Sequence, residues 1–117
     1  MNKIFYLSSC DTCRKIIKQL PQTTNLVFRD IRQDAITEDE LSEMHQLAGS
    51  YEALFSRKAQ LYKSLGLKEK HLTESDFKKH ILDHYTFLSR PVFMINDKIF
   101  IGNSNKSVVG AIAELSI

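Results

Sequence analysis

The order of apolar and polar residues predicts a strand, a helix and a second strand within about thirty residues of the start. Residues 3–7, KIFYL, are mostly β-branched or aromatic and predict a buried strand. Residues 12–20 carry an apolar stripe at helical spacing, and Pro21 ends that predicted helix. The stripe consists of Ile16, Ile17 and Leu20. Residues 25–31, NLVFRDI, predict the second strand, and together these elements form a parallel βαβ unit with a right-handed crossover.

Three helical patterns fill the middle of the chain. Thr37 and Glu40 form a capping box that predicts the start of the first helix. Residues 56–66 predict the second, with Gly66 placed to follow its C-terminus. Residues 73–85 predict the third, which begins with Thr73 as its N-cap. The expected inward-facing residues are Leu41, Met44, Leu47 and Ala48 in the first helix, and Phe77, Ile81, Leu82 and Tyr85 in the third.

The last part of the chain predicts a β-hairpin and a closing helix. Strands over 92–96 and 98–101 flank a turn at residues 96–98, and residues 103–115 form the helix. Its expected inward-facing residues are Val108, Val109, Ile112 and Leu115. The order βαβ followed by ββα predicts an α/β thioredoxin-like fold with a mixed four-stranded sheet. An all-helical insertion then lies between the second and third strands.

Length and composition favour one globular domain. With 117 residues, 43% of them hydrophobic, the chain can bury a single core. We expect a single domain over 1–117, with a thioredoxin-like core at 1–36 and 86–117 and the helical insertion at 37–85. The net charge of +2 and the absence of a dense basic run argue against direct nucleic-acid binding. Without a leader pattern or an apolar stretch of membrane-spanning length, we expect a cytoplasmic monomer that does not bind membranes.

Both cysteines of the chain lie where the first predicted strand turns into the first predicted helix. Unpaired amides at a helix start favour a thiolate, so we expect Cys10 to be a nucleophile, with Arg14 and Lys15 adding to the positive field. The spacing of three lets Cys13 reach back, resolve an adduct on Cys10 and close a disulfide. In a reducing cytoplasm such a pair favours catalysis or metal binding over a permanent disulfide.

Two other interpretations of the cysteine pair remain open. Structural zinc needs four ligands, of which a Cys-x-x-Cys supplies two. His80 and His84 have the right mutual spacing but are distant in sequence, and we expect them to be solvated surface residues and the protein to bind no metal. Alternatively, Cys10 and Cys13 are two inert core thiols.

Arg90 is the basic residue whose position fits a functional site best. It precedes Pro91 at the start of a predicted strand, where a cis peptide bond is tolerated. In a thioredoxin-like fold this turn lies against the reactive cysteine, which places Arg90 beside Cys10 and offers forked donors to an oxyanion. The alternative is an ordinary surface arginine at a turn.

Three segments together resemble the ArsC/Spx family, which contains ArsC-type arsenate reductases, their relatives and the redox-sensing regulator Spx. They are LSSCDTCRKI at 7–16, FSRKAQLYKSLGL at 55–67 and LSRPVFMINDKIFIGNSNKSVV at 88–109. The resemblance covers essentially the whole chain. It implies a thiol-dependent oxidoreductase that acts on a small oxyanion or on a thiol or disulfide substrate, with no bound cofactor. Glutathione, glutaredoxin or thioredoxin is the implied reductant.

The resemblance assigns roles residue by residue. Cys10 matches the nucleophile, and Arg57 and Arg90 match two of the three arginines that bind the oxyanion. Gly102 stands nearest to the place of the third, and Tyr6 replaces the histidine four residues before the nucleophile. The implied catalytic residues are Cys10, Cys13, Arg57 and Arg90, and the implied substrate-binding residues are Ser9, Arg57, Arg90, Pro91 and Gly102.

The same resemblance supplies an alternative function. Cys13 is shared with Spx, and Gly49 is compatible with the glycine by which Spx meets RNA polymerase. On this hypothesis a Cys10–Cys13 disulfide switches a surface that binds the RNA polymerase α subunit, and no substrate is turned over.

Overall fold

The chain folds into two compact units in a computed structural model that describes residues 2–21 and 26–116. Met1–Ala35 and Arg90–Ile117 form one unit, here the sheet unit, and Ile36–Ser89 form the other, the helical unit. Within the described residues, no helix has both the length and the apolar character that crossing a membrane requires. The expectation of a single domain over 1–117 stays a prediction.

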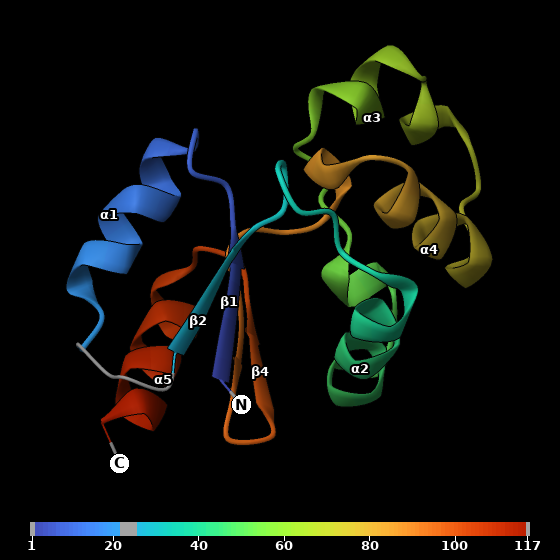
Figure 1. Cartoon of the computed structure of the whole chain (residues 1–117). Coiled ribbons are helices and arrows are strands. Elements are labelled where there is room, and N and C mark those ends of the chain that lie inside the picture. The colour runs from blue at the N-terminus through green and yellow to red at the C-terminus, as the bar shows by residue number, and fades with distance from the viewer. Residues whose placement is uncertain (1, 22–25, 117) are drawn as a thin grey trace. The chain divides into compact units, whose positions relative to one another are not determined.

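The sheet unit contains one mixed sheet with the strand order β2-β1-β3-β4 (Figure 1). β1 pairs parallel with β2 and antiparallel with β3, and β4 pairs antiparallel with β3. This arrangement confirms the α/β thioredoxin-like fold, with an all-helical segment between the second and third strands. Its elements are β1 (Asn2–Tyr6), α1 (Asp11–Gln19), β2 (Leu26–Asp30), β3 (Val92–Ile95), β4 (Lys98–Ile101) and α5 (Asn105–Leu115).

Helices α1 and α5 bury their apolar stripes against one face of this sheet (Figure 1). Ile16 of α1 and Val108 of α5 pack in one cluster with Ile4 of β1 and Phe93 of β3. These side chains are at most 6% exposed. The core therefore fixes the start of α1, which carries both cysteines, against the central strand β1.

The hairpin between β3 and β4 turns at Asn96 and Asp97, whose φ angles are 51° and 62°. Two consecutive positive φ angles define the tight turn whose twist matches paired antiparallel strands, and asparagine and aspartate tolerate that conformation better than most residues. β3 consequently ends at Ile95, one residue before the predicted end.

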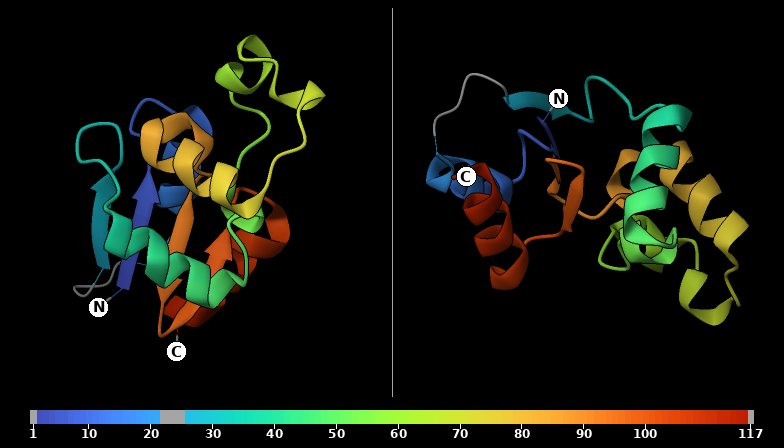
Figure 2. Two further views of the ribbon diagram at one scale, coloured as in Figure 1. Left: turned by 90° about the vertical axis from the view of Figure 1, so that its right-hand side faces the viewer. Right: turned by 90° about the horizontal axis from the view of Figure 1, so that it is seen from below.

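The helical unit consists of three α-helices joined by single turns of 3-10 helix. Both predicted N-caps are confirmed, since Thr37 and Thr73 each accept a hydrogen bond from the amide of the third helical residue. Phe55 stacks on Phe87 with ring centroids 5.3 Å apart, which holds the middle of the unit together. The elements are α2 (Glu38–Ala48), η1 (Glu52–Leu54), α3 (Gln60–Ser64), η2 (Leu67–Glu69), α4 (Glu74–Asp83) and η3 (Tyr85–Phe87). Figure 2 shows the ribbon from two further directions.

Several sequence-based boundaries and faces are wrong. The helix predicted over 56–66 shortens to Gln60–Ser64 because Ala59 is buried in an extended conformation as its N-cap. Gly66 nevertheless follows α3 in the left-handed conformation, as predicted. Asn25, the predicted start of the second strand, lies outside the described residues. Leu47, Leu82 and Val109, predicted to face inward, are exposed. Tyr85 belongs to η3 because α4 ends at Asp83.

Candidate active site

Cys10 is the N-cap of α1, and Cys13 lies in the first turn of the same helix. The Cys10 amide donates to the Leu7 carbonyl over 3.1 Å, which closes a tight turn, and the Cys10 carbonyl accepts from the Arg14 amide over 3.1 Å. The Cys10 side chain is partly exposed, whereas Cys13 is fully buried, and both thiols are free. An accessible thiol at a helix start beside a buried one fits the expected division into nucleophile and resolving cysteine.

The surroundings move the two thiol pKa values in opposite directions. Burial works to raise the pKa of Cys10, but the Cys13 amide and thiol, the Thr12 amide and the Arg90 charge together lower it below its usual value. Burial raises the pKa of Cys13 to about 11, and the neighbouring Cys10 adds to the rise. Cys10 is therefore the thiol that ionises first.

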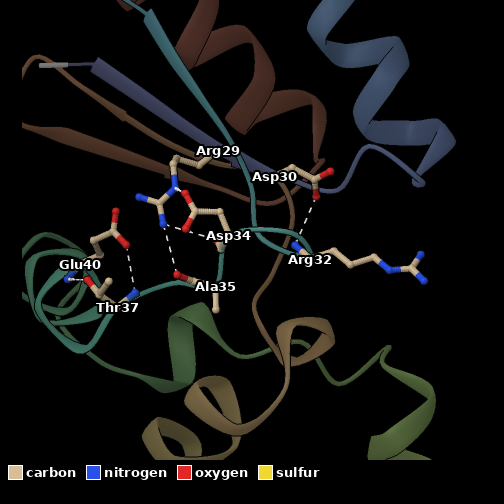
Figure 3. A network of polar contacts seen from close by, with 7 residues as sticks. All are labelled: Arg29, Asp30, Arg32, Asp34, Ala35, Thr37 and Glu40. Carbon is tan, nitrogen blue, oxygen red and sulfur yellow. Dashed lines mark hydrogen bonds and ion pairs between the residues drawn. The ribbon is translucent and has the colours of Figure 1, made fainter.

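The turn before Cys10 is anchored on two sides. The Ser8 hydroxyl donates to the Asp30 carboxylate over 2.5 Å, and the Ser8 carbonyl accepts from the Arg14 guanidinium over 2.6 Å. Asp30 also accepts from the Arg32 amide over 3.2 Å (Figure 3). Arg14, expected to add to the field at Cys10, is thus engaged with Ser8 and forms an ion pair with Asp11.

Sequence reasoning missed Ser8 and Asp30. The available signal was the parallel pairing of the first two strands, because carboxyl ends of parallel strands meet at the same edge. In the structure Tyr6 pairs with Asp30 in that register. The Tyr6 ring, which replaces the family's histidine, packs edge-on against Phe28 with centroids 6.2 Å apart.

The segment 90–102 contributes the other side of the site in the sheet unit. The Arg90–Pro91 peptide bond is cis, a conformation that the sequence allowed at this position, and the Arg90 charge acts on both cysteines. The Gly102 amide donates to the Pro91 carbonyl over 2.8 Å. Gly102 has a φ of 85°, a conformation that an arginine at this position would adopt only with strain. Ser9 lies exposed in the turn before Cys10.

Arg57 lies in the helical unit. Its guanidinium forms an ion pair with Glu52 at 2.7 Å and lies over the Phe77 ring, 5.5 Å from the centroid. The structure thus groups Ser9, Cys10, Cys13, Arg90, Pro91 and Gly102 within one unit, and it describes Arg57 within the other. A role for Arg57 beside Cys10 stays a prediction.

The two histidines considered as metal ligands make other contacts. His84 Nδ1 lies 2.8 Å from the Thr86 hydroxyl, and the His80 ring packs against Phe87 with centroids 5.2 Å apart. Both side chains are partly buried and therefore less solvated than expected. Across the described ranges, no three histidine, cysteine, aspartate or glutamate residues are grouped so that they could hold a metal ion.

A second polar network fixes the segment that follows β2. The Arg29 Nε lies 2.9 Å from the Asp34 carboxylate, and a terminal nitrogen of Arg29 donates to the Ala35 carbonyl over 3.2 Å (Figure 3). The Arg29 guanidinium also lies over the Phe5 ring. This arginine therefore has a structural explanation that does not involve the thiols.

The fold and the cysteine site define a thioredoxin-like α/β protein with a Cys-x-x-Cys pair at a helix start. A sequence model of the ArsC family matches residues 5–111, and the chain therefore belongs to the ArsC family. No curated protein sequence matches it significantly.

Solved structures with this fold match almost the whole chain. An arsenate reductase from Vibrio cholerae is 20% identical, with a TM-score of 0.78 over 94% of this chain and 96% of its own. An arsenate reductase (ArsC) related protein from Brucella melitensis is 17% identical, with a TM-score of 0.70 over 93% and 92%. A Staphylococcus aureus protein is 25% identical, with a TM-score of 0.73 over 92% and 94%. At these identities the likeness establishes the shared fold.

Proposed function

We propose that this protein is a thiol-dependent oxidoreductase of the arsenate-reductase-like type, with Cys10 as nucleophile and Cys13 as resolving thiol. The observation that carries the proposal is the contrast between the two thiols. Cys10 caps α1 and has a lowered pKa, whereas Cys13, in the first turn of that helix, is buried and stays protonated well above neutral pH. An accessible thiol that ionises more readily than its buried partner is the arrangement that this chemistry needs.

With an oxyanion such as arsenate, the Cys10 thiolate attacks As(V) and displaces a protonated oxygen as water. Cys13 then loses its proton and attacks the Cys10 sulfur, which forms the Cys10–Cys13 disulfide. The electron pair of the sulfur–arsenic bond stays on arsenic, which leaves as As(III). With a disulfide substrate, Cys10 displaces one thiolate, and Cys13 releases the second from the mixed disulfide.

The causes of the raised pKa of Cys13 agree with this order, in which Cys10 reacts first and Cys13 second. Burial is its largest cause, and Cys10 contributes to the rise both through its charge and through its hydrogen bond with Cys13. When Cys10 becomes bonded to the substrate, its negative charge disappears and these two contributions with it. Cys13 therefore becomes easier to ionise at the stage when its attack is required.

The remaining residues are proposed to stabilise negative charge and to position the substrate. Arg90 stabilises the Cys10 thiolate, and we propose that it also holds negative charge developing on the substrate, together with Arg57. Ser9, Pro91 and Gly102 border the substrate position in this proposal. Glutathione, glutaredoxin or thioredoxin in a reducing cytoplasm would return the disulfide to the dithiol, at the cost of two electrons.

Single-turnover reduction of arsenate and of a mixed disulfide with glutathione tests the proposal. Wild type is expected to convert at least one substrate and to form the intramolecular disulfide, whereas Cys10→Ser is inactive and Cys13→Ser accumulates the Cys10 adduct. The enzyme hypothesis would be refuted if Cys10→Ser kept both activities, or if wild type turned over neither substrate.

A second candidate is a redox-sensing regulator like Spx. Gly102 in place of the third arginine favours it, because an oxyanion-reducing site would then have one cation fewer. Here the Cys10–Cys13 disulfide would control binding to the RNA polymerase α subunit. A pull-down with the C-terminal domain of that subunit, in oxidised and reduced states, separates the candidates. Binding that changes with oxidation supports the regulator, and no binding in either state removes it.

A further inference from the structure

The register of β1 and β2 brings the Asp30 carboxylate to the turn that carries Cys10. Asp30 is the last residue of β2 and pairs with Tyr6, the last residue of the parallel strand β1. Successive side chains alternate between the two faces of a strand, so the residue two positions after Tyr6 lies on the same side as Asp30. That residue is Ser8, and its hydroxyl donates to the Asp30 carboxylate over 2.5 Å.

The two polar contacts of Ser8 connect it to different elements. Its carbonyl accepts from the Arg14 guanidinium over 2.6 Å, and because Arg14 belongs to α1, this contact ties Ser8 to the helix that follows. The contact with Asp30 instead ties the turn to β2. The other oxygen of the Asp30 carboxylate accepts from the Arg32 amide over 3.2 Å, which fixes the carboxylate itself. The turn is therefore held between a strand and a helix.

The acidity of Cys10 depends on where this turn holds the thiol. The amides of Thr12 and Cys13 on α1 lower the pKa of Cys10, and so does the charge of Arg90, which precedes β3. These groups belong to two different elements of the sheet unit. The thiolate is stabilised fully only when the turn keeps Cys10 close to both of them.

We propose that Asp30 is a positioning residue for Cys10 that acts through the Ser8 hydroxyl and not through its own charge. This inference rests on the proposed function insofar as Cys10 is the nucleophile. The charge and the hydrogen bond of Asp30 have opposite consequences. A negative charge near a thiolate raises the pKa of the thiol, so removal of the charge alone would make Cys10 more acidic. Removal of the hydrogen bond lets the turn move and makes Cys10 less acidic.

The pH dependence of Cys10 alkylation by iodoacetamide separates these two consequences. The tryptic peptide 4–14 contains both cysteines, and its fragmentation in the mass spectrometer assigns the modification to Cys10. Asp30→Ala is expected to slow alkylation at pH 7 about threefold, because a hydrogen bond to a carboxylate is lost and the thiolate fraction falls. The rate at the alkaline plateau should not change, since only the pKa of Cys10 moves upward.

Two further variants separate position from charge and from a general disturbance of the loop. Asp30→Asn is the conservative variant, since its amide group can accept from the Arg32 amide and donate to the Ser8 oxygen. It is expected to react at least as fast as wild type at pH 7. Asp34→Ala is the matched control, because Asp34 is a second carboxylate just after β2 and pairs with Arg29. Its alkylation rate is expected within about twofold of wild type.

A double-mutant comparison tests the route through Ser8. Ser8→Ala is expected to slow alkylation of Cys10 at pH 7 about as much as Asp30→Ala does, and Asp30→Ala should add no further slowing in the Ser8→Ala background. Ser8→Ala leaves the contact between Asp30 and Arg32 in place, so it decides the question even if Asp30→Ala does not fold. Thermal unfolding shows that each compared variant is folded at the assay temperature.

Four results would overturn the inference. They are a wild-type pH profile in Ser8→Ala or in folded Asp30→Ala, an equal slowing in Asp30→Asn, an equal slowing in Asp34→Ala, and fully additive effects of Ser8→Ala and Asp30→Ala. Alkylation needs no substrate. If wild type reduces neither arsenate nor a mixed disulfide with glutathione, the proposed function fails, while the alkylation profiles still decide the role of Asp30.

Discussion

The Ser8 hydroxyl donates a hydrogen bond to the Asp30 carboxylate over 2.5 Å, and this contact joins the turn before the nucleophile to the end of β2. The two residues are 22 positions apart: Asp30 is the last residue of β2, and Ser8 follows the carboxyl end of its parallel neighbour β1. The same carboxylate accepts the Arg32 amide, so one side chain orders both loops at this edge.

Replacing Ser8 by alanine is expected to lower the free energy of unfolding by about 1 kcal/mol, because an exposed hydrogen bond to a carboxylate is lost. Urea denaturation measures the change. Ser9→Ala, in the adjacent exposed position, is the control and is expected to change stability by less than about 0.5 kcal/mol. Equal effects of the two substitutions would show that the contact with Asp30 contributes no stability.

Replacing Arg90 by glutamine is expected to raise the pKa of Cys10, because a positive charge that stabilises the thiolate is removed. The pH dependence of Cys10 alkylation by iodoacetamide gives this pKa directly. Arg90→Lys keeps the charge and is expected to preserve most of the lowering. An unchanged pKa in Arg90→Gln would exclude a direct electrostatic role.

Alkaline pH is expected to remove the stability that Cys13 contributes. Its folded pKa of about 11 lies above the usual 9.0, so the folded state binds this proton more tightly. The contribution is complete below pH 9 and is lost as the pH rises through 11. The stability difference between wild type and Cys13→Ala should therefore shrink by about 2 kcal/mol between pH 8.5 and 11. A constant difference over this interval would contradict the raised pKa.

Gly110 is required in α5 because the Phe100 ring occupies the space of a side chain. A Cβ at this position would come within 2.7 Å of the ring. Gly110→Ala is expected to cost about 1 kcal/mol of stability, since overpacking outweighs the better helix propensity of alanine. In a Phe100→Ala background the same substitution is expected to be neutral or stabilising. Destabilisation of the same size in both backgrounds would rule out the ring as the cause.

Most of the fold could be predicted because its signals are local. The strand at 3–7, the capping box of Thr37 and Glu40, and the turn at 96–98 each depend on residues close in sequence. Errors arose where tertiary packing decides, as for Leu47, whose helical spacing matches a core position although the side chain is exposed. The prediction that Val109 faces inward is wrong for the same reason.

The candidate site was predictable only in part. The position of Cys10 at a helix start follows from its sequence neighbours, whereas Pro91 allowed a cis bond after Arg90 without requiring it. Two contacts were not predictable: Asp30 anchors the turn before Cys10, and Glu52 pairs with Arg57. Both depend on the positions that side chains reach in the folded structure, which composition and periodicity do not encode. Missing such partners matters, because they determine how much charge a nucleophile or an arginine presents.

The ionisation of Cys10 is the property on which the account depends most directly. Absorbance of the thiolate in the ultraviolet, followed against pH in wild type, Cys10→Ser and Cys13→Ser, assigns each thiol. Cys10 is expected to titrate below the usual 9.0 and before Cys13, whose pKa is about 11. A Cys10 that titrates at or above 9.0, or after Cys13, would contradict its assignment as the nucleophile.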